Sequence, residues 1–372
     1  MTLTAAIRAQ LTHARKRLVG KLKSARIMVL LALSWMCYAF RDQFSNFAAD
    51  RVRVSLVNLW AGEMVNFTFA DNVTGYSFPV VPDVVHFVFL GNTSVTLLDA
   101  ICVRAAWLQK KPRRLVLHCQ NCSAIRLSFH WALVERIPGL DVRHMEMPEG
   151  VSDVRYSDAE EVRPLVALSI LLAEGGIYVD KDTYLLRSAG AYRRYEMALA
   201  WPSGGRLRTE LIVAHRNARL LRMLFDAYHR LLRELKAYKP VELLSRLERF
   251  LPVNVFSMPL FHRVPVTTKD ETSQGGAIAL ASSETARMLY SVKCDYSWRH
   301  LAAVSLMSGS EEQLRETRGE PPVNLVTIAS SRTNFGQMAR LALGGTTAMG
   351  ETRVRNVSDI AVLQYTEDAC SY

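Results

Sequence analysis

The sequence is poor in cysteine, and its cysteines are not spaced for zinc. Six occur among 372 residues, and Cys119-x-x-Cys122 has no second pair at the spacing of a zinc site. No internal repeat is visible, which argues against a repeat architecture. No basic helix is interleaved with aromatic residues, so the formal net charge of +11 is not the footprint of a nucleic-acid-binding protein.

Acidic residues are missing from the first 26 positions, where seven basic residues lie: Arg8, Arg15, Lys16, Arg17, Lys21, Lys23 and Arg26. The total of +11 less the +7 of this segment leaves about +4 on the remaining 346 residues. A mild positive excess of this kind is compatible with a small anionic ligand.

The basic segment leads into an apolar stretch, Ile27–Phe40, which carries no charge. Its fourteen residues are fewer than the roughly 20 of a typical membrane span, but Lys23, Arg26 and Arg41 can snorkel at its two ends. The alternatives are a buried core helix and a cleaved signal peptide, and the long basic flank and poor cleavage site argue against the signal peptide. We predict a transmembrane signal-anchor at 27–40, a cytosolic tail at 1–26 and a lumenal location for the rest of the chain.

Five N-glycosylation sequons lie C-terminal to this stretch, although the chain has only eleven asparagines. They begin at Asn66, Asn72, Asn92, Asn121 and Asn356. Their grouping favours a secretory lumen, so we expect a glycoprotein with one or two disulfides. The pairing of the cysteines cannot be read from the sequence.

The rest of the chain divides into a stem at 41–81, one α/β domain at 82–345 and a C-terminal tail at 346–372. The predicted strands are Val84–Leu90, Arg114–Cys119, Asp141–Met147, Ile177–Asp180, Met197–Trp201 and Leu211–His215. The predicted helices are Val95–Leu108, Ile125–Ile137, Val162–Ala173, Ala218–Leu235 and Gly336–Leu343. This alternation predicts a Rossmann-like, mostly parallel sheet flanked by helices, in which ligands bind beyond the carboxyl ends of the strands.

The segment Glu174–Leu186 (EGGIYVDKDTYLL) carries the strongest chemical signal. It predicts a helix end, a turn at Gly175 and Gly176, a short buried strand, and then two carboxylates, Asp180 and Asp182. Two carboxylates one residue apart at a strand end can share one hard divalent cation. A metal beside an open glycine turn suits a diphosphate, because the cation neutralises phosphate oxygens. The bare D-x-D pattern is weak by itself, since a solvated turn has the same sequence.

The whole block resembles the sugar-binding region of a family of Golgi glycosyltransferases with a DXD motif. This family includes α-1,4-galactosyl- and α-1,4-N-acetylglucosaminyltransferases and relatives of the yeast mannosyltransferases. The segments PDVVHFVFLGN and KPRRLVLHC are similar to its first two strands, and SAGAYRRYEMALAW and ELIVAHRNARLLRMLFDAY resemble the stretch after D-x-D. The similarity covers roughly 82–235. It implies a GT-A fold, a UDP-sugar donor and a bound Mn²⁺ or Mg²⁺.

The resemblance also implies roles for individual residues. Asp182 would bind the metal directly, and Asp180 would contact the metal or the ribose. Gly175 and Gly176 would shape the nucleotide-sugar pocket. Glu210 stands where relatives often place a polar group near the sugar, which makes it a candidate for contact with the acceptor or the anomeric carbon.

Several other residues have two interpretations each. Tyr178 either stacks on the base of the nucleotide or packs in the core, and packing is favoured. Lys181 is either a phosphate contact or a solvated charge. His86 and His118 lie in apolar strands and are expected to be satisfied core histidines, and a core role is also favoured for His215.

The chain departs from the family pattern near the block. Relatives carry an Asp and, three residues later, an Arg about one helix before the double glycine, where this chain has Pro164 and Ala167. Asp158 and Arg163 are candidates for shifted equivalents. Relatives also often have a late His that completes the metal shell, and Ser305 stands at that position. The loss of one such contact can weaken binding by orders of magnitude.

These observations predict a single-pass type II Golgi membrane protein with a lumenal GT-A-like domain. The expected activity is metal-dependent transfer of a hexose or N-acetylhexosamine from a UDP-sugar to a glycan or glycolipid acceptor, with retention implied by the resemblance. Two alternatives stay open: a lumenal glycan- or nucleotide-binding protein with a degraded site, and a membrane-tethered interaction protein in which D-x-D is only a turn. Donor, acceptor, linkage and oligomeric state are not predicted.

Overall fold

The computed structural model describes residues 65, 67–91, 94–146, 159–201, 207–234, 247, 250–252, 255, 258–267, 277–279, 283–290, 297–306, 323–345, 349–350 and 365–367. They belong to one unit, Val65–Tyr372. None of the helices among these residues is both long enough and apolar enough to cross a membrane. The predicted cytosolic tail, the signal-anchor, the first part of the stem and most of the C-terminal tail lie outside the described residues.

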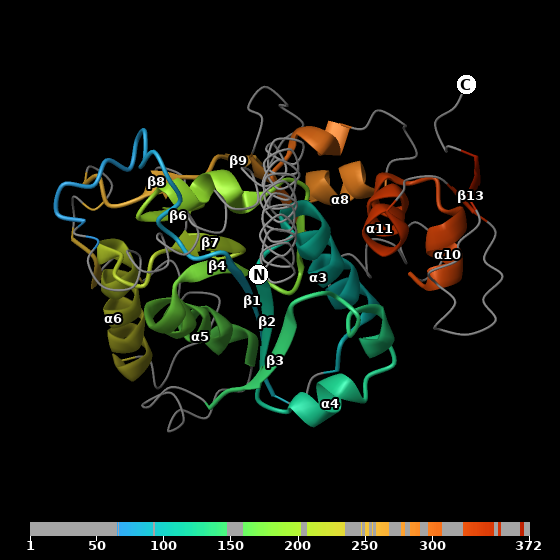
Figure 1. Cartoon of the computed structure of the whole chain (residues 1–372), viewed down its shortest axis with the longest axis horizontal. Helices are drawn as coiled ribbons and strands as arrows, with labels where there is room; N and C mark the ends of the chain where they lie inside the picture. Colours follow the sequence, from blue (N-terminus) through green and yellow to red (C-terminus); the bar gives the residue numbers. More distant parts are fainter. Residues whose placement is uncertain are drawn as a thin grey trace, which may run out of the picture. The chain divides into compact units, whose positions relative to one another are not determined.

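A seven-stranded sheet forms the centre of the fold, in the order β3-β2-β1-β4-β7-β6-β8 (Figure 1). Its strands are β1 (Val84–Phe89), β2 (Arg114–Cys119), β3 (Leu140–His144), β4 (Gly176–Val179), β6 (Met197–Leu199), β7 (Leu211–Ala214) and β8 (His262–Arg263). β1 pairs in parallel with β2 and β4, β2 with β3, and β6 with β8, while β7 runs antiparallel to β4 and β6. Six strands share one direction, which confirms the mostly parallel sheet predicted from the sequence.

Helices cover both faces of this sheet, as predicted. α5 (Ala159–Glu174) and α6 (Arg219–Glu234) lie on one face, and α3 (Leu97–Lys110) and α11 (Asn334–Gly344) lie on the other (Figure 1). α3 and α11 share one hydrophobic core and α5 and α6 share another, so a core lies on each face of the sheet.

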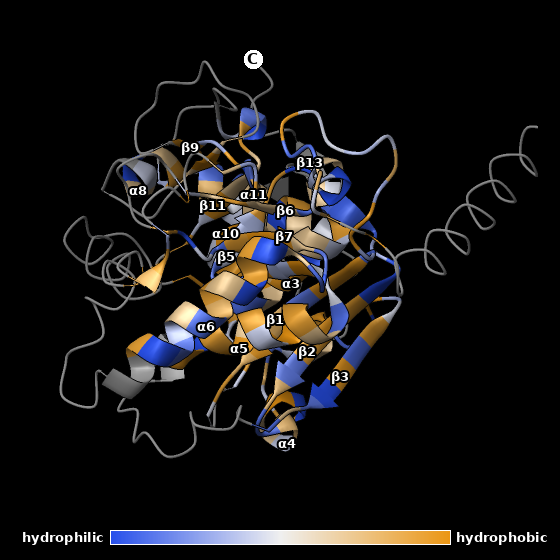
Figure 2. Ribbon diagram, turned by 90° about the vertical axis from the view of Figure 1, so that its left-hand side faces the viewer, coloured by the Kyte–Doolittle hydropathy of each residue, from blue (hydrophilic) through white to orange (hydrophobic). Residues whose placement is uncertain are grey.

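The two cores follow the alternation of the strands, because successive side chains of a strand point to opposite faces. Phe87 and Val179 pack in the core of α3 and α11, whereas Val88 and Tyr178 pack in the core of α5 and α6. Figure 2, seen from the side of α5 and α6, shows the hydrophilic end of β3 at the edge of the sheet. β1 is buried along its whole length and occupies the interior of the sheet.

A second, four-stranded sheet, which the sequence did not predict, has the order β5-β11-β10-β9. Its strands are β5 (Thr183–Leu185), β9 (Val266–Thr267), β10 (Ile278–Ala279) and β11 (Ala303–Ser305). The remaining elements are α4 (Cys122–Arg126), α8 (Ser283–Leu289), α10 (Leu325–Ser330), β12 (Met349–Gly350), β13 (Tyr365–Glu367) and the short 3₁₀ turns Trp131–Leu133, Ala189–Arg194 and Ser297–His300. β5 follows β4 after the three residues of D-x-D, so this motif joins the two sheets.

One predicted helix is wrong, whereas the other predicted elements that fall on described residues occur with small shifts at their ends. The range Ile125–Ile137 contains only the end of α4 and one 3₁₀ turn. Leu127 and Phe129 are 85% and 70% exposed, so the apolar residues of this range do not form one buried helical stripe. The Ser128 hydroxyl donates a hydrogen bond to the Ile125 carbonyl at the point where the helix ends.

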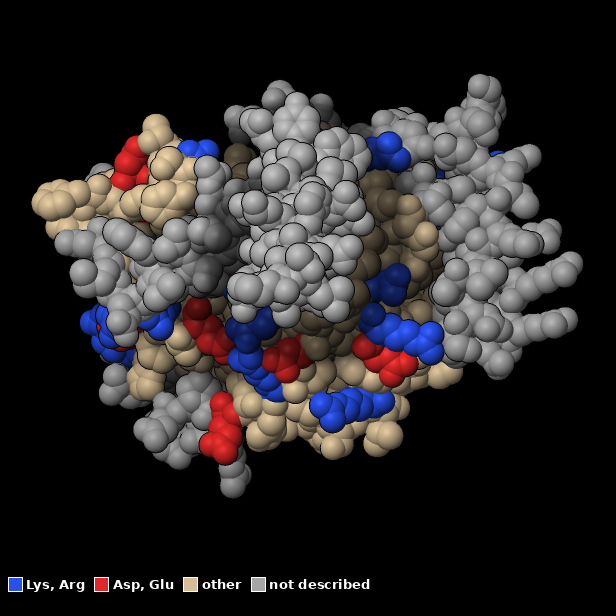
Figure 3. Space-filling model, in the orientation of Figure 1, with Lys and Arg blue, Asp and Glu red and all other residues tan. Residues whose placement is uncertain are grey.

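Acidic and basic side chains are mixed on the face of the molecule shown in Figure 3. The described part of this face carries no continuous basic patch.

The last part of the predicted stem packs on the domain. Phe67, Ala70, Val80 and Val81 are buried and belong to its hydrophobic core. The backbone N–H groups of Val80 and Val81 donate to the Arg193 carbonyl at 2.8 and 3.1 Å. Residues 67–81 therefore contribute to the stability of the domain.

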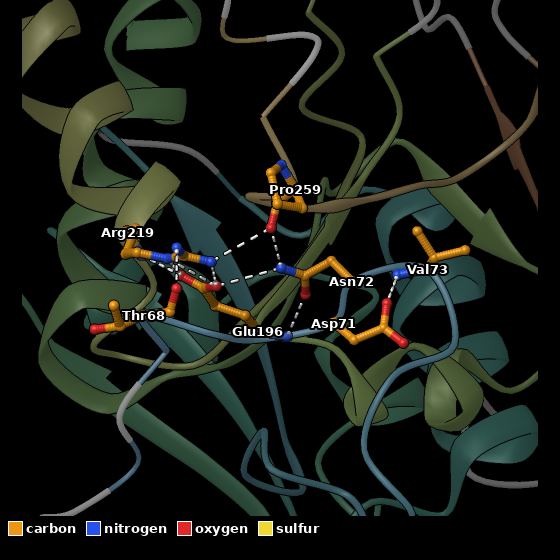
Figure 4. A network of polar contacts seen from close by, with 7 residues as sticks. All are labelled: Thr68, Asp71, Asn72, Val73, Glu196, Arg219 and Pro259. Carbon is orange, nitrogen blue, oxygen red and sulfur yellow. Dashed lines mark hydrogen bonds and ion pairs between the residues drawn. The ribbon is translucent and has the colours of Figure 1, made fainter.

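A buried carboxylate, Glu196, ties this segment to the sheet (Figure 4). It accepts hydrogen bonds from Arg219 Nη2 at 2.8 Å and from the Arg219 backbone N–H at 2.6 Å. Because Arg219 begins α6, the carboxylate also lies at a helix N-terminus, where negative charge is stabilised. Asn72 Nδ2 donates to the Pro259 carbonyl at 2.8 Å and to Glu196 Oε2 at 3.3 Å, and Asn72 Oδ1 accepts from the Glu196 N–H at 3.0 Å.

This network affects the predicted glycosylation at Asn72, which is 3% exposed. A glycan would be attached to Nδ2, the atom that donates both hydrogen bonds, so the folded chain has no room for a glycan at Asn72. Asn121 is exposed, and its Oδ1 accepts from the Ala124 N–H at 3.0 Å. The other predicted sites, Asn66, Asn92 and Asn356, lie outside the described residues.

We expect Glu196→Gln to lower the free energy of unfolding by about 3 kcal/mol, because Arg219 then loses its buried charged partner. Urea unfolding followed by circular dichroism measures this change. Glu135→Gln, the same substitution at an exposed glutamate, is the matched control and should stay within about 0.5 kcal/mol of the wild type. Equal unfolding midpoints for the two variants would contradict the role given to the network.

Candidate functional site

The D-x-D residues form a tight turn between the two sheets. The Thr183 N–H donates to the Asp180 carbonyl at 2.9 Å, which closes the turn, and the Asp180 N–H donates to the Glu210 carbonyl at 2.9 Å. The Leu306 N–H donates to the Asp182 carbonyl at 2.6 Å. These backbone hydrogen bonds fix both carboxylates at the carboxyl end of β4, the edge at which the predicted fold binds ligands.

Asp180 has a cationic partner from α5. Arg163 Nη1 donates to Asp180 Oδ1 at 3.0 Å, and the Lys181 backbone N–H donates to the same oxygen at 2.8 Å. The Arg163 side chain is only 6% exposed, and its guanidinium stays charged at every physiological pH. The candidate Arg163 is therefore brought to D-x-D, whereas Asp158 lies outside the described residues.

Lys181 pairs with the second carboxylate of the motif. Its Nζ lies 3.1 Å from Asp182 Oδ1 and 3.3 Å from Asp182 Oδ2. The same Nζ lies 4.0 Å from Oδ1 of Asp99, a buried residue in the first turn of α3. The ammonium thus stands between two carboxylates from different elements, so the interpretation of Lys181 as a solvated charge does not hold.

Burial raises the pKa of Asp182 to about 6. The Lys181 ammonium lowers the pKa, and the nearby carboxylates of Asp180 and Asp99 raise it. Asp182 is therefore a buried acid whose ionised form is stabilised by the Lys181 ammonium.

Glu210 lies beside Asp180, because the two residues share the backbone hydrogen bond between β4 and the start of β7. Its Oε1 pairs with Arg208 Nη2. Its Oε2 is buried, and no described residue donates a hydrogen bond to it. This oxygen therefore lacks the hydrogen bond that buried polar atoms ordinarily have.

The residues at this turn fit the predicted divalent cation in ligand type only. Carboxylate oxygens are the right type of ligand for Mn²⁺ or Mg²⁺. However, the Lys181 ammonium stands against both Asp182 oxygens, and Arg163 holds Asp180 Oδ1. Ser305, which pairs with Thr183 across β5 and β11, offers a neutral hydroxyl. Within the described ranges, no group of three His, Cys, Asp or Glu side chains is placed to hold a metal ion. Because Lys181 and Arg163 already engage the two carboxylates, the turn as arranged does not fit a divalent cation.

The glycine pair and D-x-D stand at opposite ends of β4, in the predicted order of helix end, glycine turn, strand and acidic pair. Gly175 precedes β4 and Gly176 begins it, whereas D-x-D follows the strand, which separates Gly176 from Asp180 by about 13 Å along it. The two glycines have φ angles of +65° and +125°, and a Cβ on Gly176 would lie 2.7 Å from His86 Nε2. A Cβ on Gly175 would lie 3.1 Å from Pro82 Cδ. The packing of the chain accounts for both glycines without a ligand.

His86 and His118 form a buried pair that supports this glycine turn, in agreement with their predicted core role. His86 Nε2 donates to the Gly175 carbonyl at 2.9 Å, because a carbonyl can only accept. In a neutral ring Nδ1 is then the acceptor, so His118 Nε2 donates to His86 Nδ1 at 3.0 Å. Burial lowers the pKa of His86 to about 4 and the pKa of His118 to about 3, so both are neutral near pH 7.

Two more candidates do not face the D-x-D turn. Tyr178 is 1% exposed and packs in the core of α5 and α6, so it offers no face for a nucleotide base. His215 is 1% exposed and stacks edge-on against Phe67, beyond the end of β7 that lies beside Gly176. The structure confirms the packing interpretation of both residues.

Sequence reasoning missed Asp99. The segment Thr96–Asp99 has the pattern of a capping box, and both of its reciprocal hydrogen bonds are present, at 3.1 and 2.8 Å. This pattern marks the start of α3 but carries no signal that Asp99 Oδ1 reaches Lys181. That contact depends on the packing of α3 against β5.

Cys119 and Cys122 form a disulfide between the end of β2 and the start of α4. This bond confirms that the C-x-x-C pair is not a zinc site and that the described chain contains a disulfide. Cys102 is buried in the core of α3.

No protein-family model and no curated protein sequence matches this chain. Among solved structures, the PaToxG glycosyltransferase matches 57% of this chain and 80% of its own length, with 11% identity and a TM-score of 0.36. The galactosyltransferase LgtC, in complex with donor and acceptor sugar analogues, matches 66% of this chain and 98% of its own, with 8% identity and a TM-score of 0.36. The mannosyltransferase PcManGT from Pyrobaculum calidifontis, in complex with GDP-Man and Mn²⁺, matches 59% and 82%, with 13% identity and a TM-score of 0.28. These similarities concern the fold alone.

The buried histidine pair predicts that stability falls in mild acid. The pKa of each ring is lower in the folded chain than the ordinary 6.5, so the unfolded chain binds more protons as the pH falls from about 6.5 towards 4. We expect the free energy of unfolding to fall by about 2–4 kcal/mol between pH 7 and pH 5, measured by urea unfolding at each pH. The variant His86→Gln/His118→Gln should lose most of this slope. The same slope in both proteins would assign the pH dependence to other groups.

Proposed function

We propose that this chain is a glycosyltransferase that binds a UDP-sugar at the D-x-D turn and transfers its hexose or N-acetylhexosamine to a glycan or glycolipid acceptor. The observation that supports this most is the charged group at the carboxyl end of β4. Asp180, Asp182, Asp99, Arg163 and Lys181 meet there at the junction of two sheets. The resemblance of the sequence block to the DXD glycosyltransferases points to the same function.

Each part of this group has a task in the transfer. Arg163 and Lys181 supply positive charge for the diphosphate, whose negative charge grows as the bond to the anomeric carbon breaks. Asp180 and Glu210 accept hydrogen bonds from sugar or ribose hydroxyls. The acceptor oxygen forms the new bond to the anomeric carbon, and its proton passes to the leaving diphosphate. The resemblance implies that this occurs on one face of the sugar, with retention, and the mechanism contains no metal step because the residues do not fit a metal as arranged.

The compartment belongs to the same proposal. The basic tail at 1–26, the apolar stretch at 27–40 and the sequons that follow support a single-pass type II protein of the Golgi membrane with a lumenal domain. Membrane attachment would keep the enzyme near glycolipid and glycoprotein acceptors.

A second function is favoured by one feature of the site. Lys181 pairs with Asp182 where relatives in the resembling family are expected to bind a metal, and Ser305 provides no strong ligand. A lumenal nucleotide- or glycan-binding protein without turnover needs only the binding part of the site. Release of UDP from a UDP-sugar by the purified chain distinguishes the two, because only the transferase produces it.

Binding of UDP to the purified full-length chain, measured by calorimetry in buffer with Mn²⁺, tests the proposed site. Asp182→Asn removes the charge that holds Lys181 in place, so we expect UDP affinity to fall at least about tenfold. Asp141→Asn is the matched control, because Asp141 is also ion-paired, at 2.7 Å with Arg143, but lies on the edge strand β3. The proposal fails if folded wild-type protein does not bind UDP, or if both variants bind it equally.

The lumenal location predicts a specific pattern of glycosylation. In a secretory host, we expect a glycan at the exposed Asn121 and none at the buried Asn72. Glycosidase treatment in heavy-oxygen water followed by peptide mass spectrometry marks each occupied asparagine. A glycan at Asn72 would contradict the buried network, and the absence of any glycan would contradict the lumenal location.

A further inference from the structure

The Lys181 ammonium occupies the position that a cation bound by Asp182 would take. Its Nζ approaches both carboxylate oxygens almost equally, at 3.1 and 3.3 Å. A carboxylate that binds a cation with both oxygens holds it in this way. The Lys181 side chain is 15% exposed, so the ammonium is largely withdrawn from water.

Asp99 is the second carboxylate beside the Lys181 ammonium. Its side chain is 3% exposed, and its Oδ2 accepts the N–H of Thr96. Its Oδ1 accepts no hydrogen bond within the described part of the chain and lies 4.0 Å from Lys181 Nζ. A buried carboxylate requires a nearby positive charge, and the Lys181 ammonium provides it.

The first carboxylate of the motif has its own fixed cation. Arg163 donates to Asp180 Oδ1 and cannot lose its proton, so this oxygen is already engaged by a permanent charge. A divalent ion at the turn would therefore lie close to both an ammonium and a guanidinium. Repulsion between like charges in a partly buried site would oppose its binding.

We propose that the Lys181 ammonium, held between Asp182 and Asp99, takes the place of a divalent metal ion, so that this chain binds a nucleoside diphosphate without a metal. This inference rests on the proposed function for its ligand, the diphosphate of a UDP-sugar. It reverses the expectation of bound Mn²⁺ or Mg²⁺ drawn from the sequence resemblance.

The substitution Lys181→Met tests the proposal, because methionine has a similar length and no charge. Removal of the ammonium leaves Asp99, Asp180 and Asp182 near one another with one cation fewer. We expect the wild-type full-length chain to show no saturable Mn²⁺ binding by electron paramagnetic resonance. Lys181→Met should gain Mn²⁺ affinity of at least about tenfold, and the further change Asp182→Asn should abolish the gain.

Lys110→Met is the matched control. Lys110 Nζ also forms a close ion pair, 2.6 Å from Asp83 Oδ1, and its side chain is 7% exposed. Lys110 is the last residue of α3, whereas Asp99 lies in the first turn of that helix. This variant should gain no Mn²⁺ binding. Wild-type binding of Mn²⁺ as tight as that of Lys181→Met would overturn the proposal, and so would the absence of a gain in folded Lys181→Met.

UDP binding separates this inference from the proposed function. The wild type should bind UDP equally, within about twofold, in EDTA and in Mn²⁺, whereas Lys181→Met should bind UDP weakly in EDTA and regain affinity in Mn²⁺. Wild-type binding that occurs only with Mn²⁺ would overturn the inference and leave the proposed function standing. Absence of UDP binding under both conditions would overturn the proposed function and metal-free nucleotide binding together, while the Mn²⁺ titration would still decide whether Lys181 excludes the metal.

Discussion

Strand β4 is the element on which the position of the D-x-D turn depends, because contacts at both of its ends fix the register of the strand. At its start, a Cβ on Gly176 would approach the His86 ring nitrogen to 2.7 Å. At its end, backbone hydrogen bonds hold the turn that leads into the second sheet. A shift of one residue in register would turn every side chain of the strand to the other face. With both ends fixed, the backbone of the D-x-D turn is held between the two sheets.

Each carboxylate at this turn forms an ion pair with a basic side chain of the same protein. Asp180 pairs with Arg163 of α5, and Asp182 shares Lys181 with Asp99 of α3. Burial of an unpaired carboxylate is costly, and the raised pKa of Asp182 reflects that cost. Three carboxylates against two cations leave one negative charge in excess. Hydrogen-bond donors, such as the hydroxyls of the proposed sugar ligand, would stabilise such a group.

The sequence predicted the long apolar elements well and the short or non-local features poorly. β2 occurs with the predicted ends, because its apolar run has few alternative structures. The strands of the second sheet have two or three residues, too few for a period to be visible. The glycine turn, the strand and D-x-D occur in the predicted order, because all three are local features of one continuous segment. Contacts such as the one between Asp99 and Lys181 arise from packing between elements, and no local pattern contains them.

The double glycine and D-x-D carry different kinds of information, although they are neighbours in the sequence. Gly175 and Gly176 are required by their contacts with Pro82 and His86, so any chain with this packing needs them whether or not it binds a ligand. Their resemblance to a family motif therefore supports the fold. The acidic turn differs, because burial of its carboxylates opposes folding and helps no hydrophobic contact. The proposed function therefore rests on the costly arrangement of charges at the carboxyl edge of β4, whereas packing alone accounts for the glycines.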